Sequence, residues 1–400
     1  MPRSTRKTIR GSEANHPLIV PIESLSQYTY LRFYTEFMSF SDSQLKKIRD
    51  QLERSQSWLE NIQSEIESSP SQSTLPLAST KPTQPPPSSI LFDRDYGGFT
   101  GGHLKVWDYF NHVTFSPRYS PSIYFTPQSS WDRNNPWFNL DKKFILSQPL
   151  ANPDLIFMEG LDWQLLDQNY KHNSPVPIIN LIQHVRHGYP DNLRYPFLKY
   201  KAIRICVSPE IKQYLEDHAQ VNGELLVIPC GLELQQIPLS KNWDQKDYDV
   251  LIAALKEPEL GQELKQKLEI TGQKVELLSH QLSRSDYLEQ LNRARITVFL
   301  PNQKEGEGFY LPALEGMAVG TLVICPDCIG NRSFCLPGYN CLRPDYRVES
   351  LLNAIQQALQ YSQTQVKPLL TQAKRTANEH NLLKERQAFL EILDHIHEIW

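Results

Sequence analysis

The chain has 400 residues, 40% of them hydrophobic, so it can bury a sizeable core, and its length predicts two or three domains. A formal net charge of −4 argues against a nucleic-acid-binding protein. The basic start of the chain, from Arg3 to Arg10, is compatible with a solvated end or with weak peripheral contact with an acidic membrane. No apolar run reaches the ~20 residues that span a bilayer and no signal-peptide core is present, so we expect a cytoplasmic protein.

Three N-terminal segments precede the first expected strand. Residues 1–40 form a tail with short segments, residues 41–68 an amphipathic, coiled-coil-like helix, and residues 69–89 a Pro/Ser-rich extended linker. The apolar positions of the helix follow the alternating three-and-four spacing of a heptad: Leu45, Ile48, Leu52, Leu59, Ile62 and Ile66. About three heptads are marginal for an autonomous coiled coil, so packing against the rest of the chain and formation of a homodimer are both open.

From residue 90 onward, short apolar runs alternate with helical patterns, which predicts doubly wound parallel sheets. One series occupies residues 90–237 and a second occupies residues 246–365, with a polar hinge between them. The expected strands are 90–92, 122–125, 155–157, 178–181, 203–207 and 225–228 in the first series, then 248–252, 275–278, 296–300 and 322–324 in the second. The chain is expected to be helical from Val348 onward, and residues 366–400 form its last helices.

Two segments of the first series are candidate ligand contacts. The glycine-rich turn 97–102 follows the first strand, and its Gly101 and Gly102 can bring backbone against a ligand or simply connect a strand to a helix. A histidine pair, His184 and His187, follows the fourth strand. Each histidine is either a functional group or a satisfied polar group at a strand end.

The most specific chemical signal is the stretch EGFYLPALEGMA, which begins at Glu307 and includes Glu315. Gly306 and Gly308 free the backbone for positive φ and close approach, while Pro312 suits the first turn of a helix, so a loop enters a helix here. A buried strand precedes the loop. Carboxylates at a strand's carboxyl end can accept hydrogen bonds from vicinal hydroxyls, and the helix terminus can face a diphosphate. The alternative is a helix start that carries acids for its dipole.

Together, these residues resemble the paired-glutamate signature of retaining glycosyltransferases of family 4, also called glycosyl transferases group 1. The resemblance implies an α/β protein of the GT-B fold, in which two Rossmann-like domains face a cleft and the last helices cross back to the first domain. Here an N-terminal helical extension is added. The first domain would bind the acceptor and the second the nucleotide-sugar.

The resemblance also implies roles for single residues. Glu307 would contact the donor sugar and Glu315 the ribose, and the nucleotide-sugar site would include the residues between them: Gly308, Phe309, Tyr310 and Leu311. Tyr310 stands where the family usually has a small residue, and Leu322 where it usually has proline. His184 would lie near the reaction centre, with His103 toward the acceptor, and the loop of Gly101 and Gly102 would face the cleft.

The sequence has fewer cationic residues for the departing diphosphate than the resembling family usually has. The family usually has an arginine and a lysine after the first strand of the second domain, and here only Lys256 occupies that neighbourhood. Arg284 or Arg332 would supply the second charge, and Arg332 is the better candidate of the two, although a surface arginine is its ordinary reading. Cys230 replaces a usual asparagine.

Four of the six cysteines lie close together in the sequence: Cys325, Cys328, Cys335 and Cys341. The first pair has the two-residue gap of a zinc knuckle, whereas the second is too loosely spaced for common zinc patterns. A structural zinc site and reduced, partly buried thiols are the two alternatives, and the second is favoured.

These observations predict a metal-independent retaining hexosyltransferase without a cofactor. Its donor would be a UDP- or GDP-sugar, and its acceptor a lipid-linked sugar, a glycan such as a growing polysaccharide, a protein or a small molecule. Two alternatives are a catalytically silent GT-B relative that acts as an assembly scaffold through its N-terminal helix, and a nucleotide-sugar hydrolase or epimerase.

Overall fold

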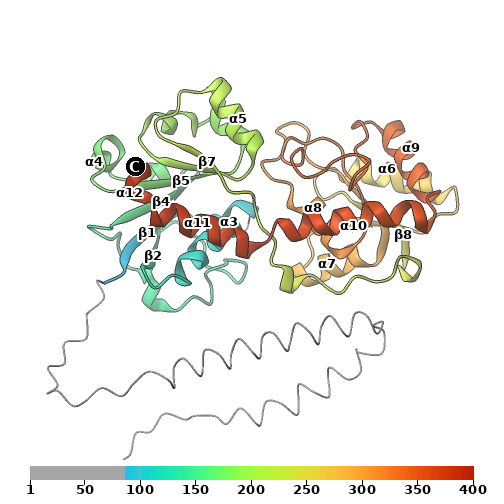
Figure 1. Ribbon diagram of the computed structural model, residues 1–400, viewed down its shortest axis with the longest axis horizontal. Coiled ribbons are helices and arrows are strands. Elements are labelled where there is room, and N and C mark those ends of the chain that lie inside the picture. The colour runs from blue at the N-terminus through green and yellow to red at the C-terminus, as the bar shows by residue number, and fades with distance from the viewer. Residues whose placement is uncertain (1–85, 99) are drawn as a thin grey trace, which may run out of the picture. The chain divides into compact units, whose positions relative to one another are not determined.

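The computed structural model describes residues 86–98 and 100–400, which form two parallel β-sheets (Figure 1). The strands are β1 (Ser88–Arg94), β2 (Tyr119–Phe125), β3 (Ile145–Leu146), β4 (Leu155–Glu159), β5 (Ile178–Ile182), β6 (Ile203–Cys206), β7 (Leu225–Val227), β8 (Tyr248–Ala253), β9 (Val275–Leu278), β10 (Ala294–Phe299) and β11 (Leu322–Ile324). The expected tail, amphipathic helix and linker up to residue 85 lie outside the described residues.

Helices connect and follow these strands. The α-helices are α3 (Gly101–Thr114), α4 (Gln168–Asn173), α5 (Pro209–His218), α6 (Pro258–Glu269), α7 (Arg284–Asn292), α8 (Leu311–Val319), α9 (Val348–Leu359), α10 (Gln363–Glu379), α11 (Leu382–Asp394) and α12 (Ile396–Ile399). The 3-10 helices are η2 (Lys142–Phe144), η3 (Asp162–Gln164), η4 (Val185–Gly188), η5 (Tyr195–Lys199), η6 (Leu234–Gln236) and η7 (Trp243–Gln245).

The first sheet has the strand order β3-β2-β1-β4-β5-β6-β7, and all of its pairings are parallel. A parallel sheet is covered on both faces, so its central strands are apolar throughout rather than alternating. All five residues of β5 are accordingly buried. The sequence missed β3, because its two half-buried residues give too short an apolar run to be recognised.

The second sheet has the order β11-β10-β8-β9 and is also parallel throughout. Its core contains Val250 and Ile252 of β8, Ile296 and Val298 of β10, and residues of the helices that cover it. Each expected strand of this series lies at the position that the apolar runs predicted. The fold class expected from the sequence, α/β with parallel sheets, is confirmed.

The chain order of the strands reverses once in each sheet. In the first sheet the chain leaves β1 for β2 on one side and later returns to β4 on the other, and in the second it leaves β8 for β9 and returns to β10. Open α/β sheets bind ligands outside the carboxyl ends of the strands at such switch points. Residues that follow β1, β4, β8 and β10 are therefore the first candidates for a site.

The C-terminal helices tie back to the first sheet. Figure 1 shows α11 beside α3, and the core of the first sheet includes Phe389 and Leu393 of α11 and Ile396 of α12. A buried ion pair between Lys105 of α3 and Glu385 of α11, with Nζ and Oε2 2.9 Å apart, accompanies this packing.

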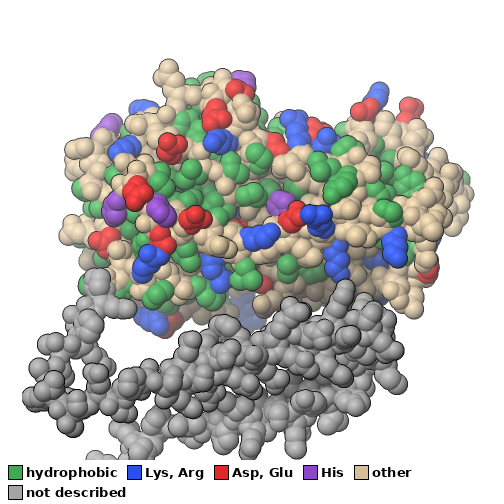
Figure 2. All heavy atoms as spheres, viewed as in Figure 1, with side chains coloured by type: hydrophobic (Ala, Val, Ile, Leu, Met, Phe, Trp, Pro, Cys, Tyr) green, Lys and Arg blue, Asp and Glu red, His purple; other side chains and the backbone are tan. Residues whose placement is uncertain are grey.

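Charged side chains of both signs are interspersed over the face drawn in Figure 2. Among the residues that the structure describes, no helix combines the length and the apolar character required to cross a bilayer.

Candidate functional site

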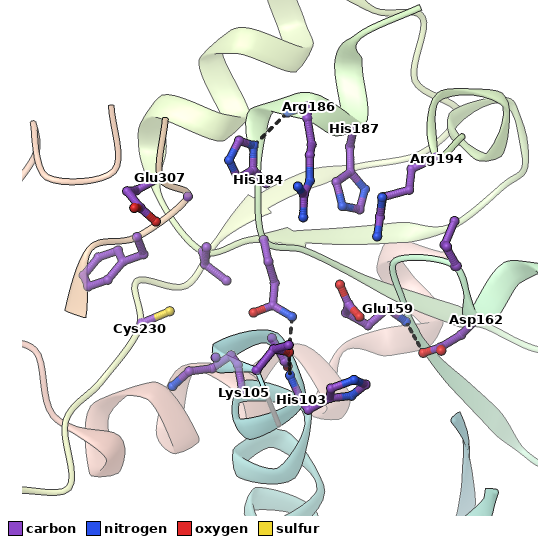
Figure 3. Close-up of a pocket in the computed structure, with 18 of the residues that line it drawn as sticks. His103, Lys105, Glu159, Asp162, His184, Arg186, His187, Arg194, Cys230 and Glu307 are labelled. Atoms are coloured by element: carbon purple, nitrogen blue, oxygen red, sulfur yellow. Dashed lines mark hydrogen bonds between the residues drawn. The ribbon is translucent and has the colours of Figure 1, made fainter. Parts of the chain in front are cut away.

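A cavity of about 540 Å³ lies at the two switch points and is lined by side chains from both sheets' connections (Figure 3). The first sheet contributes residues that follow β1, β4 and β5 and the first turn of α3. From the second sheet come Lys256, Glu307, Gly308, Phe309 and Leu311. The structure thus brings together most of the predicted site residues: Glu307, His184, Lys256, Gly308, Phe309, Leu311, Gly101 and Gly102.

The acidic loop, residues 300–310 between β10 and α8, is held in place by its glycines. Gly306 has a φ of 73°, a conformation that residues with a Cβ rarely adopt. Gly308 has a different role, since a Cβ at this position would lie 1.6 Å from the carbonyl oxygen of Gln183. The loop therefore approaches the backbone that follows β5 as closely as a glycine permits, and α8 begins three residues later at Leu311, next to Pro312, as predicted.

Glu307 and Lys256 face each other across the switch point of the second sheet. The Lys256 Nζ donates to Glu307 Oε1 at 2.6 Å, and the backbone N–H of Asn302 donates to the same oxygen at 3.0 Å. The Glu307 side chain is 14% exposed and that of Lys256 is 51% exposed. The pair provides one positioned cation and one carboxylate at the cavity.

Tyr310 lines a second, smaller cavity of about 290 Å³ that shares Lys256, Glu307 and Phe309 with the main one. This cavity is bounded by Tyr287 of α7 and by the apolar side chains of Leu255 and Phe299. Its mostly apolar wall beside the Lys256–Glu307 pair is suited to the flat face of a base or a sugar.

Glu315 is placed differently from the prediction. Its side chain is only 5% exposed, it lines neither cavity, and its carboxylate accepts from Arg284 and from the Tyr287 hydroxyl. Burial raises the pKa of Glu315, and these two donors oppose the shift. The reason is its position in α8, one turn inside the helix, where the side chain turns toward α7. Ribose recognition by Glu315 stays a prediction and would require Arg284 to give up its contact.

Arg332 is not brought to the main cavity. Its guanidinium is held by Asp327, with Nε and Nη2 donating at 2.8 and 2.6 Å, and it lines a separate surface hollow with residues of α5. The sequence placed it after a strand next to the acidic loop, but the local carboxylate turns it outward. In this arrangement Lys256 is the cation of the second sheet's connections that lines the main cavity.

His184 bridges the two halves of the cavity. Its Nδ1 accepts from the backbone N–H of Arg186 at 3.1 Å, so its Nε2 carries the proton and donates to the carbonyl of Gly306 at 3.3 Å. Burial and the Arg186 charge lower its pKa, which keeps the ring neutral. Both ring nitrogens are engaged, so His184 fixes the distance between the strand end and the acidic loop in this state.

The predicted glycine-rich turn ends in the first turn of α3. Thr100 caps this helix by accepting from the backbone N–H of His103 at 3.2 Å, and Gly102 accepts at its carbonyl from Gln183 Nε2 at 3.1 Å. Gly101 and Gly102 therefore line the cavity with the backbone of the first turn of α3, and they do not belong to a free loop.

A buried charged network at the switch point of the first sheet was missed by the sequence analysis. Arg94, at the end of β1, is 2% exposed and contacts Asp162, the His103 ring and, at 3.3 Å, Glu159 at the end of β4. Burial and Arg94 lower the pKa of His103 to about 4, so this ring is neutral, with Nδ1 accepting from Arg94. Burial raises the pKa of Asp162 to about 7. The only sequence signal was a charged residue at the end of each apolar strand.

Three further side chains of the same wall, Arg186, His187 and Arg194, point into the cavity in Figure 3. Arg186 Nη1 also reaches across to Glu305 Oε2 at 2.9 Å. His187 is buried, and its pKa is lowered well below its usual value by burial and by Arg194 and Arg186. Of these three residues, the sequence analysis named only His187 as a candidate.

The four clustered cysteines are all buried, and every cysteine of the described part of the chain is free. In residues 86–98 and 100–400, no group of three or more His, Cys, Asp or Glu side chains is arranged to hold a metal ion. Burial raises the pKa of the Cys335 thiol well above its usual range. The four thiols are buried behind the acidic loop, and the choice between reduced thiols and a structural zinc stays a prediction.

Comparison with known proteins agrees with this geometry. Residues 232–361, which hold the acidic loop, match the family described as Glycosyl transferases group 1. Among curated proteins, none matches the chain in sequence.

Several solved structures share the fold at low identity. Sucrose-phosphate synthase from Thermosynechococcus elongatus matches with a TM-score of 0.58 and 14% identity over 78% of this chain and 99% of its own. HepE from Anabaena, solved with UDP and glucose, matches with a TM-score of 0.58 and 13% identity over 77% of this chain and 99% of its own. The lipopolysaccharide outer core galactosyltransferase WaaB matches with a TM-score of 0.55 and 12% identity over 76% and 99%. Residues 232–361 therefore form a glycosyl transferases group 1 domain, and the chain shares the GT-B fold of these solved structures.

Proposed function

We propose that the chain transfers a hexose from a UDP- or GDP-sugar to an acceptor hydroxyl with retention of configuration. The observation that carries this proposal is the Lys256–Glu307 pair at the cavity between the two switch points, next to the start of α8. The donor would occupy the side of the second sheet, and the acceptor the side of the first. The solved structures of HepE with UDP-glucose support a donor of this class.

The chemistry assigned to each group follows from its surroundings. A departing nucleoside diphosphate gains negative charge, and a positioned cation in a site shielded from water stabilises that charge by a few kcal/mol. Lys256 is placed to do this, and Glu307 holds its ammonium while leaving the second carboxylate oxygen for a sugar hydroxyl. Tyr310 narrows the smaller cavity and would restrict the donor.

A donor panel tests the proposal. The full-length protein is incubated with UDP- and GDP-hexoses, and release of nucleoside diphosphate and binding of UDP or GDP by calorimetry are measured. Binding of one diphosphate together with slow donor hydrolysis would support the function. A folded sample that binds neither would contradict it, and product analysis by NMR separates transfer from hydrolysis or epimerisation.

Metal independence is part of the proposal, since Lys256 and the backbone amides at the start of α8 are assigned the neutralisation of the diphosphate. Turnover in EDTA should equal turnover in added Mg²⁺. A loss of more than about tenfold in EDTA, restored by Mg²⁺, would show that a cation supplies charge that the residues here lack.

A second candidate is a catalytically silent relative that binds a nucleotide-sugar and acts as an assembly scaffold. The contact of Glu315 with Arg284 and Tyr287 favours it, because a carboxylate that is already occupied is not free to hold ribose. Diphosphate binding without any donor hydrolysis or transfer would support this reading.

A further inference from the structure

The end of the cavity opposite Glu307 carries a cluster of donors that the proposed transfer does not use. We propose that this arginine corner, defined as Arg186, His187 and Arg194, binds an oxyanion carried by the acceptor, a phosphate monoester or a carboxylate. In Figure 3 the three side chains point into the cavity from one wall, while Glu307 lies at the other end. The inference rests on the proposed function, since it names the acceptor class of the same site.

Arg194 is the centre of the corner because its guanidinium has room and no fixed partner. It precedes η5 and is half-buried, and within the described residues it has no carboxylate oxygen within 4.0 Å of its nitrogens and no side-chain hydrogen bond. Gly160 provides the space, since a Cβ there would lie 3.4 Å from Arg194 Nε. A half-buried arginine that is aimed into a cavity and not paired is suited to a bidentate oxyanion.

Like charges are crowded at this wall. Burial lowers the pKa of Arg194 and the nearby Arg186 lowers it further, while the charges of Glu159 and Asp162 oppose the shift. The pKa of the buried His187 is lowered by burial, then by Arg194 and Arg186. An oxyanion bound between these groups would relieve the repulsion and would be selected over a neutral group of the same shape.

The carboxylates of the same cavity do not cancel this charge. Glu159 and Asp162 both contact Arg94, so their negative charge is shared with a third guanidinium. Burial raises the pKa of Asp162 to about 7, and the neighbouring Glu159 contributes to the shift, so Asp162 is partly protonated at neutral pH. Of the three guanidinium groups at this end, Arg94 contacts both of these carboxylates and Arg186 contacts Glu305, so Arg194 is left without a carboxylate within 4.0 Å among the described residues.

Arg186 connects the corner to the acidic loop. Its partner Glu305 is 60% exposed and lies two residues before Glu307, so the ion pair at 2.9 Å is open to exchange with a ligand. An acceptor oxyanion would compete with Glu305 for Arg186. With its anion at the arginine corner, the acceptor would extend its reactive hydroxyl toward the Lys256–Glu307 pair.

The first experiment is a calorimetric titration of inorganic phosphate into the full-length protein saturated with UDP or GDP, so that phosphate cannot occupy the donor site. We expect R194Q to weaken phosphate binding at least about tenfold and R194K to weaken it less, because one charge but not the fork is kept. R133Q, which changes an exposed arginine that does not line the cavity, is the matched control and should bind as wild type does. Equal affinities in wild type and R194Q, or no phosphate binding at all, would overturn the inference.

The second experiment distinguishes the two sources of the oxyanion by initial rates with a neutral hexose, a hexose phosphate and a hexuronate as acceptors. A higher kcat/KM for the phosphate or for the uronate identifies the group, and that preference should be lost in R194Q but kept in R133Q. A neutral acceptor that is used best, with no effect of R194Q, would contradict the proposal.

The two proposals can fail separately. If no nucleoside diphosphate binds, the titration is run without it, and Arg194-dependent phosphate binding would then uphold the anion site while the glycosyltransferase function fails.

Discussion

Lys256 and Glu307 differ sharply in their exposure to water, and this difference determines what a substitution at Glu307 does. A carboxylate that is 14% exposed holds an ammonium that is 51% exposed, so the carboxylate orients the lysine rather than the reverse. We expect E307Q to lower kcat by roughly 100-fold, the effect of losing one positioned electrostatic group, while UDP or GDP binding changes little.

Steady-state rates and calorimetry measure the two effects separately. E263Q, at an exposed position of α6, is the control for loss of one negative charge. If E307Q transferred sugar at the wild-type rate, the assignment of the Lys256–Glu307 pair would be wrong.

Asp93 predicts a pH dependence of stability. This β1 residue is 4% exposed, its Oδ1 has no hydrogen-bond partner within the described residues, and burial raises its pKa to about 6 from 3.8. Between these pKa values the folded protein binds more protons than the unfolded chain, so the free energy of unfolding falls as the pH rises through this window. We expect D93N to be more stable than wild type by roughly 1–3 kcal/mol at pH 8 and by less at pH 5, as urea denaturation would measure.

Asp154 provides a control of opposite sign. The backbone N–H and the hydroxyl of Ser89 donate to its Oδ2 at 2.7 and 2.8 Å, and these bonds lower its pKa. The stabilisation is present above the unfolded pKa and is lost as the pH falls, so D154N should be less stable than wild type at pH 8. Equal shifts of the same sign in D93N and D154N would contradict both assignments.

Single residues were predictable from the sequence only where a local pattern marked them. Glu307 and Gly308 were found because glycines, proline and carboxylates lie in one short stretch that resembles a family signature. Arg94 was missed, although it is buried, because its carboxylate partners Glu159 and Asp162 lie more than 60 residues away in the sequence. A charge at the end of an apolar run gives no information about its partners until the strand order is known.

At the scale of helices and strands, the buried pair Lys105–Glu385 joins α3 to the C-terminal α11. Glu385 also accepts from His112 Nε2 at 3.2 Å and from the backbone N–H of Gly231, and its pKa is lowered although burial alone would raise it, since the Lys105 charge and the His112 contact outweigh burial. We expect E385Q to lower the free energy of unfolding by about 1–3 kcal/mol, because His112 and the Gly231 N–H lose a charged acceptor while Lys105 keeps its ion pair with Asp108 at 2.8 Å.

Urea denaturation measures this loss. The double variant K105M/E385L should recover little of the stability, because it leaves the mostly buried Asp108 without its Lys105 partner. Equal stability of wild type and E385Q would mean that α11 is held by the packing of Phe389 and Leu393 alone.

The strands were predictable because each buried strand of a parallel sheet is one continuous stretch of the sequence with its own apolar pattern. Strands buried on both faces appear as continuous apolar runs, as in β5 and β8, and their register follows once the runs are aligned. The two-residue β3 was not, because it depends on its pairing with β2 and not on a run of its own. The direction of the Glu315 and Arg332 side chains was equally hidden, because it depends on Arg284, Tyr287 and Asp327.

At the scale of the whole described unit, contacts at the acidic loop join the two sheets. The His184–Gly306 hydrogen bond, the Arg186–Glu305 ion pair and the approach of Gly308 to Gln183 all involve the segment after β5. Each sheet has its own core, so this contact contributes to the site more than to stability. A change confined to the contact should therefore separate activity from folding.

G308A makes that change. Its Cβ would lie 1.6 Å from the Gln183 carbonyl oxygen, a backbone atom that cannot yield, so the acidic loop must move away from the strand end. We expect kcat/KM to fall about 100-fold or more, because a displacement of about 1 Å costs that much in a positioned site, while Tm shifts by only a few degrees. G97A, where a Cβ meets nothing within 4 Å, is the matched control. Because the two cores stay intact, G308A should still bind UDP or GDP. Transfer at the wild-type rate would show that the loop does not set the distance between the two switch points, and an unfolded variant would show that the contact is required for stability.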